Sequence, residues 1–318
     1  MIAYHDVHIH NYLSGCCKDI FATVDNYIKI EKELGRKIMG FANHTWDESI
    51  PLPDTKSWGV KMYSHDIMAY MMQIKPQIPK DIEGIKVLVG AETEYAAMYD
   101  VLGMGRDAAL TLDYVLIPHT HTHMDNFVMP KLVDPVTEAA KRRLADLLKK
   151  VDGISRERAE KWANGLPVDE LKYYMTGETD NSGLPQYLAD FMVFSFRGLM
   201  NNETLKTYSD DVPVSVAHPF QPVGFGAYRM EAQSLISDNT YGELFTMASK
   251  RGIGLEINGS TNNEESFRLY GIAKECGCKF TLGTDAHSRK ALANLENTQP
   301  ILDRLAMTED DMMEFVRV

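Results

Sequence analysis

Several features are scarce in this chain of 318 residues, and each scarcity narrows the class of protein. There are only four cysteines and no Cys-x-x-Cys pair, so the sequence predicts reduced thiols and no disulfide framework. Lysine and arginine number 33 against 45 acidic residues, and this net charge of −12 leaves no basic footprint for nucleic acid. No apolar run is long enough to span a bilayer, and no basic segment with a following apolar run opens the chain. We therefore expect a cytoplasmic protein with neither a membrane nor a nucleic-acid partner.

What the chain does have is an alternating segment rich in histidine near its N-terminus, residues 4–10. Alternate side chains of an extended strand share a face, so Asp6, His8 and His10 are expected to point the same way. Two imidazoles on one face can reach one divalent cation, and Asp6 could hold a ring N–H of either. His5 lies on the other face, where we expect a structural role.

Strand-like and helix-like segments alternate along the rest of the chain, which predicts an α/β protein with a parallel sheet. The short apolar pattern of a strand occurs at residues 4–10, 37–43, 85–91, 112–118, 212–217, 254–258 and 279–283. Helical spacing occurs at residues 20–34, 61–75, 241–251 and 263–275, and again near the C-terminus.

Candidate metal ligands follow the ends of several separate strands. They are His8, His10, His44, Glu92, His119, His218, Asp285 and His287. A doubly wound sheet gathers its site at one point where the strand order reverses, whereas a closed barrel gathers strand ends around one rim. The distribution therefore favours a barrel.

One segment, residues 124–211, is too long for an ordinary connection between barrel strands. Helical patterns fill much of it, at residues 134–151, 155–164, 168–175 and 184–207. We expect a single domain, residues 1–318, with 124–211 as a helical insertion. The sequence leaves open whether the insertion is a lid over the pocket, an oligomer contact or a passive decoration, and it does not give the oligomeric state.

The candidate ligands outnumber the three that a mononuclear catalytic zinc site needs. They predict two or three divalent cations, and the mixture of nitrogen and oxygen donors favours Zn, Mn or Fe over Mg. An anionic substrate also calls for an arginine, for which Arg229 is the best candidate. We interpret His121 as pocket wall, and His123 as either pocket wall or a substrate contact.

Taken in order, these motifs resemble one known family. The set Asp6-x-His8-x-His10, His44, Glu92, His119, His218-Pro219 and Asp285-x-His287 resembles the PHP family, the polymerase and histidinol phosphatase superfamily. The resemblance implies a distorted seven-stranded (β/α)7 TIM-like barrel with a trinuclear metal site that hydrolyses phosphoesters.

The resemblance also implies which residues share each metal. The implied sets are His8, His10, Glu92 and Asp285; then Glu92, His119 and His218; then His44 and His287. Members of the family place a further His or Asp in the loop after His-x-His, where this chain has Cys16, so we expect a thiolate ligand. Asp285, Glu92 and His287 then become the candidate catalytic residues, with Asp285 a candidate proton carrier to the leaving group.

The implied activity is hydrolysis of a small phosphomonoester through a metal-bridged hydroxide. Histidinol phosphate, a nucleotide or a sugar phosphate would each fit. One alternative is an amidohydrolase-type enzyme, which also carries His-x-His on its first strand and would cleave a C–N bond. The other is a non-catalytic metal-binding module. The order of the ligands fits the phosphoesterase best.

Overall fold

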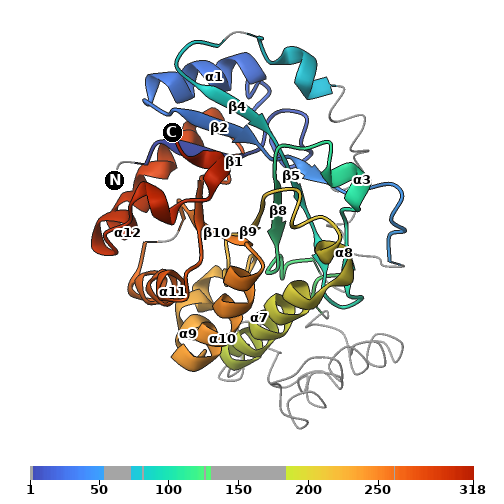
Figure 1. Ribbon diagram of the computed structural model, residues 1–318, viewed down its shortest axis with the longest axis vertical. Coiled ribbons are helices and arrows are strands. Elements are labelled where there is room, and N and C mark those ends of the chain that lie inside the picture. The colour runs from blue at the N-terminus through green and yellow to red at the C-terminus, as the bar shows by residue number, and fades with distance from the viewer. Residues whose placement is uncertain (1–2, 54–72, 81, 125–126, 130–183, 261) are drawn as a thin grey trace, which may run out of the picture.

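The computed structural model describes residues 3–53, 73–80, 82–124, 127–129, 184–260 and 262–318 (Figure 1). The strands are β1 (His5–Ile9), β2 (Ile38–Phe41), β3 (His44–Thr45), β4 (Lys86–Val89), β5 (Ala91–Thr93), β6 (Tyr95–Ala96), β7 (Val101–Leu102), β8 (Val115–Pro118), β9 (Val214–Ala217), β10 (Gly254–Asn258) and β11 (Phe280–Gly283). The α-helices are α1 (Val24–Glu33), α3 (Arg106–Ala109), α7 (Leu184–Asn201), α8 (Glu203–Lys206), α9 (Arg229–Ser234), α10 (Asp238–Lys250), α11 (Glu264–Glu275) and α12 (Gln299–Arg304). Short 3₁₀ segments are η2 (Lys75–Gln77), η3 (Gly226–Tyr228), η4 (Arg289–Thr298), η5 (Glu309–Asp311) and η6 (Glu314–Val316).

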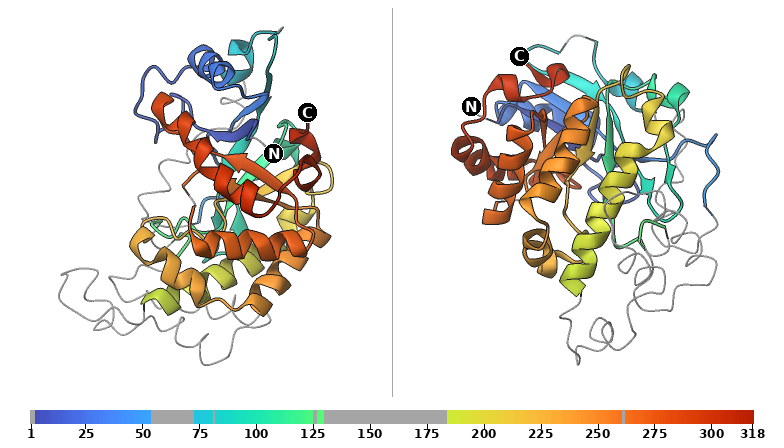
Figure 2. Two further views of the ribbon diagram at one scale, coloured as in Figure 1. Left: turned by 90° about the vertical axis from the view of Figure 1, so that its left-hand side faces the viewer. Right: turned by 60° about the horizontal axis from the view of Figure 1, so that its bottom comes forward.

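Two parallel sheets form the centre of this mixed α/β fold. One has the strand order β1-β2-β4 and the other the order β11-β10-β9-β8-β5-β3. Hydrogen bonds continue from one sheet into the other, since Gly90 N donates to Phe41 O and Glu92 N donates to Asn43 O. The end of β1 also pairs with Ala286, just after β11. Figures 1 and 2 show the longer helices on the outside of these strands.

Each of the seven predicted strand segments contains a strand in the structure, and one of the segments is interrupted. The segment 37–43 contains β2, and β3 follows directly after it. The segment 85–91 contains β4 and the start of β5, which runs past Glu92. Three predicted helices correspond to α1, α10 and α11, and the predicted helical segment 184–207 contains α7 and α8. The predicted helices at 134–151, 155–164 and 168–175 lie outside the described residues, as does most of 61–75.

Helix α7 lies in the segment that the sequence predicts to be an insertion, but it takes the place of a connecting helix. It joins the parallel neighbours β8 and β9 and packs against α9 and α10. Fourteen of its 18 residues are buried, and Ser195 Oγ donates to His119 O, directly after β8, at 2.7 Å. Among the described residues, no helix has both the length and the apolar character needed to cross a membrane.

The outer helices begin where a side chain caps them. Thr23, Ser237 and Asn263 each accept a hydrogen bond from a backbone N–H in the first turn of α1, α10 and α11, respectively. Such caps satisfy amide groups that have no partner within the helix. The first of them explains why α1 begins at Val24 and not at residue 20, where the apolar pattern begins.

A buried tyrosine ties the strands together below their carboxyl ends. The Tyr114 hydroxyl donates to Val7 O at 2.7 Å and to Phe41 O at 3.1 Å, so one side chain links β1 and β2. Its ring fits because Gly40 and Gly90 carry no side chain: a Cβ on either would lie 2.6 Å or less from the Tyr114 side chain. These contacts hold the strand ends in register beneath the candidate site.

Candidate metal centre

Side chains that bind metals gather at the carboxyl ends of the parallel strands. Because parallel strands all end at the same edge, residues far apart in the chain meet there. The residues that the structure brings together are His8, His10, Cys16, His44, Glu92, His121, His218, Asp285 and His287. The side chains of His8, His10 and Glu92 are fully buried, whereas those of Asp285 and His287 are 33% and 35% exposed. Solvent therefore reaches the cluster from the side of Asp285 and His287.

The first group surrounds the Nε2 atoms of His8 and His10, which lie 3.1 Å apart. Asp285 Oδ1 lies 3.5 Å from the former and 3.1 Å from the latter. The two oxygens of Glu92 lie 3.4 Å from the same nitrogens, one oxygen facing each. Two ligand atoms about 2.1 Å from one tetrahedral zinc ion are about 3.4 Å apart. The spacing and the donor types of this group thus fit a divalent cation.

Glu92 stands between this group and its neighbours. Its Oε1 lies 3.3 Å from His218 Nε2 and 3.7 Å from His121 Nε2, and its Oε2 lies 2.8 Å from His44 Nδ1. Burial opposes a charge on Glu92, but the facing His44 and His8 outweigh burial and hold the pKa of this carboxyl well below its usual range. An ionised carboxylate with both oxygens facing imidazoles can bridge two cations.

A third group contains the sulfur of Cys16. Four ligand atoms all lie within 4.8 Å of one another, one each from His10, Cys16, His44 and His287. Burial alone would raise the pKa of the Cys16 thiol, but hydrogen bonds from His10, His287 and His44 outweigh it and lower this pKa to about 3. The structure therefore places Cys16 among the candidate ligands, as the sequence predicts.

The backbone is strained at two of these residues. His218, directly after β9, has φ 29°, and Asp285, shortly after β11, has φ 54°. Residues other than glycine seldom adopt positive φ, and such strain concentrates at functional sites. The unusual turns aim both side chains back over the ends of the strands.

His119 is the predicted ligand that the structure does not bring to the cluster. Its Nε2 accepts a hydrogen bond of 3.0 Å from Phe220 N, and its ring packs edge-on against Phe196 and Phe220. Burial, and then the nearby His218, hold the pKa of His119 well below its usual value, which suits an acceptor nitrogen. His121, two residues later, belongs to a group with Glu92 and His218 whose ligand atoms all lie within 4.8 Å of one another.

Two buried carboxylates that the sequence analysis did not assign to the site hold the outer nitrogens of the histidines. Glu256 Oε2 accepts from His8 Nδ1 at 2.9 Å, and Glu94 Oε2 accepts from His121 Nδ1 at 2.6 Å. Metal-binding histidines commonly make such a bond, which fixes the ring and its tautomer. The prediction that Asp6 holds a ring N–H is wrong, because Asp6 accepts from Thr284 Oγ1 at 2.7 Å and from Thr284 N at 3.1 Å.

The two predicted substrate-binding residues, Arg229 and His123, make contacts with different residues. The half-buried Arg229 donates from Nη1 to Gln221 Oε1 at 3.1 Å and from Nη2 to Ser260 O at 3.3 Å. His123 is exposed, and its ring lies 5.3 Å from that of His121. His123 is thus beside the cluster, and Arg229 belongs to a polar network that begins three residues after His218.

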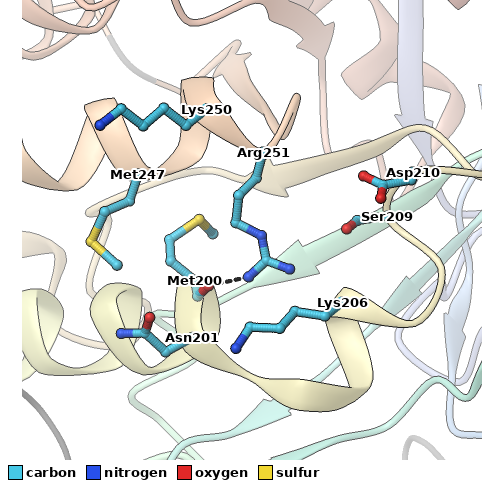
Figure 3. Close-up of a pocket in the computed structure, with 8 residues that line it drawn as sticks. All are labelled: Met200, Asn201, Lys206, Ser209, Asp210, Met247, Lys250 and Arg251. Carbon is cyan, nitrogen blue, oxygen red and sulfur yellow. Dashed lines mark hydrogen bonds between the residues drawn. The ribbon is translucent and has the colours of Figure 1, made fainter.

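A separate hollow of about 490 Å³ lies at the opposite ends of β9 and β10. Figure 3 shows its lining, which is Met200, Asn201, Lys206, Ser209, Asp210, Met247, Lys250 and Arg251. Arg251 donates to Met200 O near the end of α7, and Lys250 is in the last turn of α10. Cations at helix C-termini offset the partial negative charge of the last carbonyl groups. The cations in this hollow are therefore explained by the helix ends, and none of the candidate metal ligands lines it.

The fold and the site together define a class: a mixed α/β protein with a cluster of histidines, carboxylates and one thiol at its strand ends. No family model matches the sequence, and no curated protein matches it. Among solved structures, the chain is similar to the histidinol phosphate phosphatase of Lactococcus lactis subsp. lactis Il1403, whose crystal structure contains Zn, L-histidinol and phosphate. The TM-score is 0.53 at 13% identity, covering 97% of this chain and 95% of that one. This likeness concerns the fold, and it agrees with the fold that the sequence resemblance implies.

Proposed function

We propose that this protein is a metal-dependent phosphoesterase that hydrolyses a small phosphomonoester. One observation carries the proposal. His8, His10, Glu92 and Asp285, from three separate strand ends, surround one point with separations of 3.1–3.5 Å between the ligand atoms of the histidines and their neighbours. The likeness in fold to a phosphatase whose structure holds Zn and phosphate supports the same activity.

The proposal gives each cation its own set of residues. The first set is His8, His10, Glu92 and Asp285, the second is Glu92, His121 and His218, and the third includes His44 and His287. Two of these sets share Glu92, whose two oxygens face imidazoles from different strands. Mixed nitrogen and oxygen donors suit Zn, Mn or Fe.

Cations at these positions would lower the pKa of a bound water and neutralise charge on a phosphoryl group. The chain's own residues add position and access. Asp285, His287 and Cys16 are members of the cluster that solvent partly reaches, so a substrate would meet this side of it first. We assign to Asp285 the transfer of a proton from the attacking water to the leaving oxygen. Arg229, whose Nε lacks a hydrogen-bond partner among the described residues, is the candidate contact for a phosphate oxygen.

The same proposal includes a closed barrel of seven strands. Its support is the pairing at the end of β1, where His10 N donates to Ala286 O at 2.9 Å and Ala286 N donates to His8 O at 3.3 Å. These bonds join the first strand to the segment after the last one, which is what closure requires. Residues 1–318 then form one domain, and because α7 occupies the place of a barrel helix, the insertion is confined to residues before Leu184.

Phosphate release from a panel of phosphomonoesters and diesters tests this proposal. The protein is loaded with Zn, Mn or Fe, the Asp285→Ala variant is the blank, and amides and lactones are added to the panel. We expect release from at least one monoester that disappears in the blank. Turnover of an amide or lactone without turnover of any phosphate ester would favour the amidohydrolase reaction. No turnover by protein that holds its metals would refute catalysis altogether.

A further inference from the structure

The loop that carries Cys16 is fastened on both sides to segments that carry candidate ligands. Asn11 N donates to Asn43 Oδ1 at 2.9 Å, and Asn43 Nδ2 returns a bond of 2.8 Å to Asn11 Oδ1, directly before His44. On the other side Cys17 Sγ donates to His287 O at 3.2 Å. The position of the Cys16 sulfur between His44 and His287 is therefore built into the loop.

The sulfur and the two imidazoles lie close enough to share one cation. Every pair of ligand atoms in this group lies within 4.8 Å. In a tetrahedral site, a Zn–S bond of about 2.3 Å and a Zn–N bond of about 2.1 Å place the two ligand atoms about 3.6 Å apart. Binding therefore needs only small movements of side chains that solvent partly reaches.

His10 could join this group or the first one, but a ring nitrogen binds one cation. Its Nε2 lies 3.1 Å from both His8 Nε2 and Asp285 Oδ1, and we therefore assign His10 to the first group. This leaves Cys16, His44 and His287 as a set of one sulfur and two nitrogens. The other two sets contain only nitrogen and oxygen.

We propose that Cys16 binds the third cation as a thiolate, so that this position alone selects a thiophilic ion such as Zn²⁺. Thiolate ligands favour Zn²⁺ over Mn²⁺, whereas imidazole and carboxylate sets discriminate less. The three positions are then chemically unequal, and Zn²⁺ fills the Cys16 position when Mn²⁺ is in excess. The bound ion also covers the sulfur. This inference rests on the proposed function only for the presence of cations at the strand ends.

The chain provides a matched control in the adjacent cysteine. Cys17 is buried, and its sulfur faces the backbone oxygens of His287 and Asp19 in place of an imidazole cluster. Cys17→Ser removes a sulfur from the same loop and leaves the proposed ligand set intact. Cys16→Ser removes the sulfur of the set and keeps a side chain of similar size.

Cobalt substitution tests directly whether the Cys16 sulfur binds the metal ion. Full-length protein is stripped with a chelator and titrated with Co²⁺, and the near-ultraviolet thiolate-to-cobalt charge-transfer absorption is recorded. We expect the absorption in the wild type and in Cys17→Ser, and its loss in Cys16→Ser. Absorption that survives in Cys16→Ser, or that is absent from wild type with its full complement of Co²⁺, would overturn the proposal.

A second measurement needs no variant and covers the case in which Cys16→Ser does not fold. Wild-type protein is alkylated with iodoacetamide with and without one equivalent of Zn²⁺ in excess Mn²⁺, and labelled cysteines are identified by mass spectrometry. We expect Zn²⁺ to protect Cys16 more than tenfold, and equal labelling in both samples would refute the ligand role. Protection without phosphate release would leave this inference standing and remove the proposed activity.

Discussion

Glu256→Gln is expected to lower the affinity for the cation proposed at His8 by about 10- to 100-fold, or about 1.4–2.7 kcal/mol. The buried Glu256 carboxylate accepts three hydrogen bonds: from His8 Nδ1 at 2.9 Å, from His218 N at 3.1 Å and from Asn258 Nδ2 at 2.7 Å. Through them β10 positions ligand residues on both β1 and β9.

The magnitude follows from what glutamine cannot do. If its oxygen faces His8 and His218, its NH₂ group meets the Asn258 NH₂ group at the distance of the lost bond. Asn258 cannot turn to offer its oxygen without losing the bond that Oδ1 accepts from Ser260 N at 2.9 Å. One bond to the carboxylate therefore becomes a repulsion, and the ring of His8 also loses the negative partner that raises its basicity.

The assay is competition of the protein with a chromophoric chelator for Zn²⁺, with metal content counted at each step. Glu94→Gln is the matched comparison, because Glu94 accepts from the ring of His121 as Glu256 accepts from the ring of His8. We expect Glu256→Gln to lower the affinity for the cation at His8. We expect Glu94→Gln to lower the affinity for the cation at His121 and to leave the affinity at His8 unchanged. Unchanged affinity in Glu256→Gln, from protein with wild-type thermal stability, would refute the positioning role.

Three further predictions concern stability. Gly283→Ala places a Cβ 2.4 Å from Glu256 Oε1 and 2.5 Å from His8 Cβ. We therefore expect the free energy of unfolding, measured with urea, to fall by about 1–3 kcal/mol and bound metal to be lost. Unchanged metal content would contradict this. Tyr114→Phe removes the hydroxyl that donates to Val7 O and Phe41 O, so we expect a cost of about 1–3 kcal/mol in the same assay. Phe41 O still accepts from Gly90 N, and retained metal content is the check that the site is intact. Burial, and then the nearby charge of Asp6, raise the pKa of Glu31 to about 9 in the folded protein, so the unfolded chain loses its proton first as pH rises and stability falls between about pH 4.5 and pH 9. Glu31→Gln should flatten this dependence in urea titrations across that pH range, and an unchanged slope would contradict the assignment.

The strand ends could be predicted because alternation and apolar runs follow directly from the geometry of strands. His8 and His10 share a face in the sequence pattern, and the structure brings both to the cluster. Ligands after different strands meet because parallel strands end at one edge, which is a property of the topology and needs no coordinates.

The histidines after β8 could not be ranked in the same way. His119, His121 and His123 alternate, so periodicity gives all three the same face. The choice among them depends on where the strand ends and how the loop turns, and β8 ends at Pro118. The backbone N–H of Phe220 donates a hydrogen bond to the Nε2 of His119. The two residues are 101 positions apart, so no local sequence pattern reveals this contact.

Of the two carboxylates that hold the histidine rings, Glu256 could have been found from the sequence. Glu256 is the one charged residue in the segment 254–258. A buried carboxylate requires partners, so its place in a fully buried strand already indicates a hydrogen-bond network. The identity of the partner came only from the pairing of β10 with β9 and β11.

Phosphate release measured as metal is returned to chelated protein tests the central claim most directly. Bound metal and released phosphate are determined in the same samples, with the best phosphomonoester of the panel as substrate. We expect no release from metal-free protein and a rate that rises with the cations bound, up to two or three per chain. Release that is indifferent to metal removal, or absent from fully loaded protein, would contradict a metal-dependent phosphoesterase.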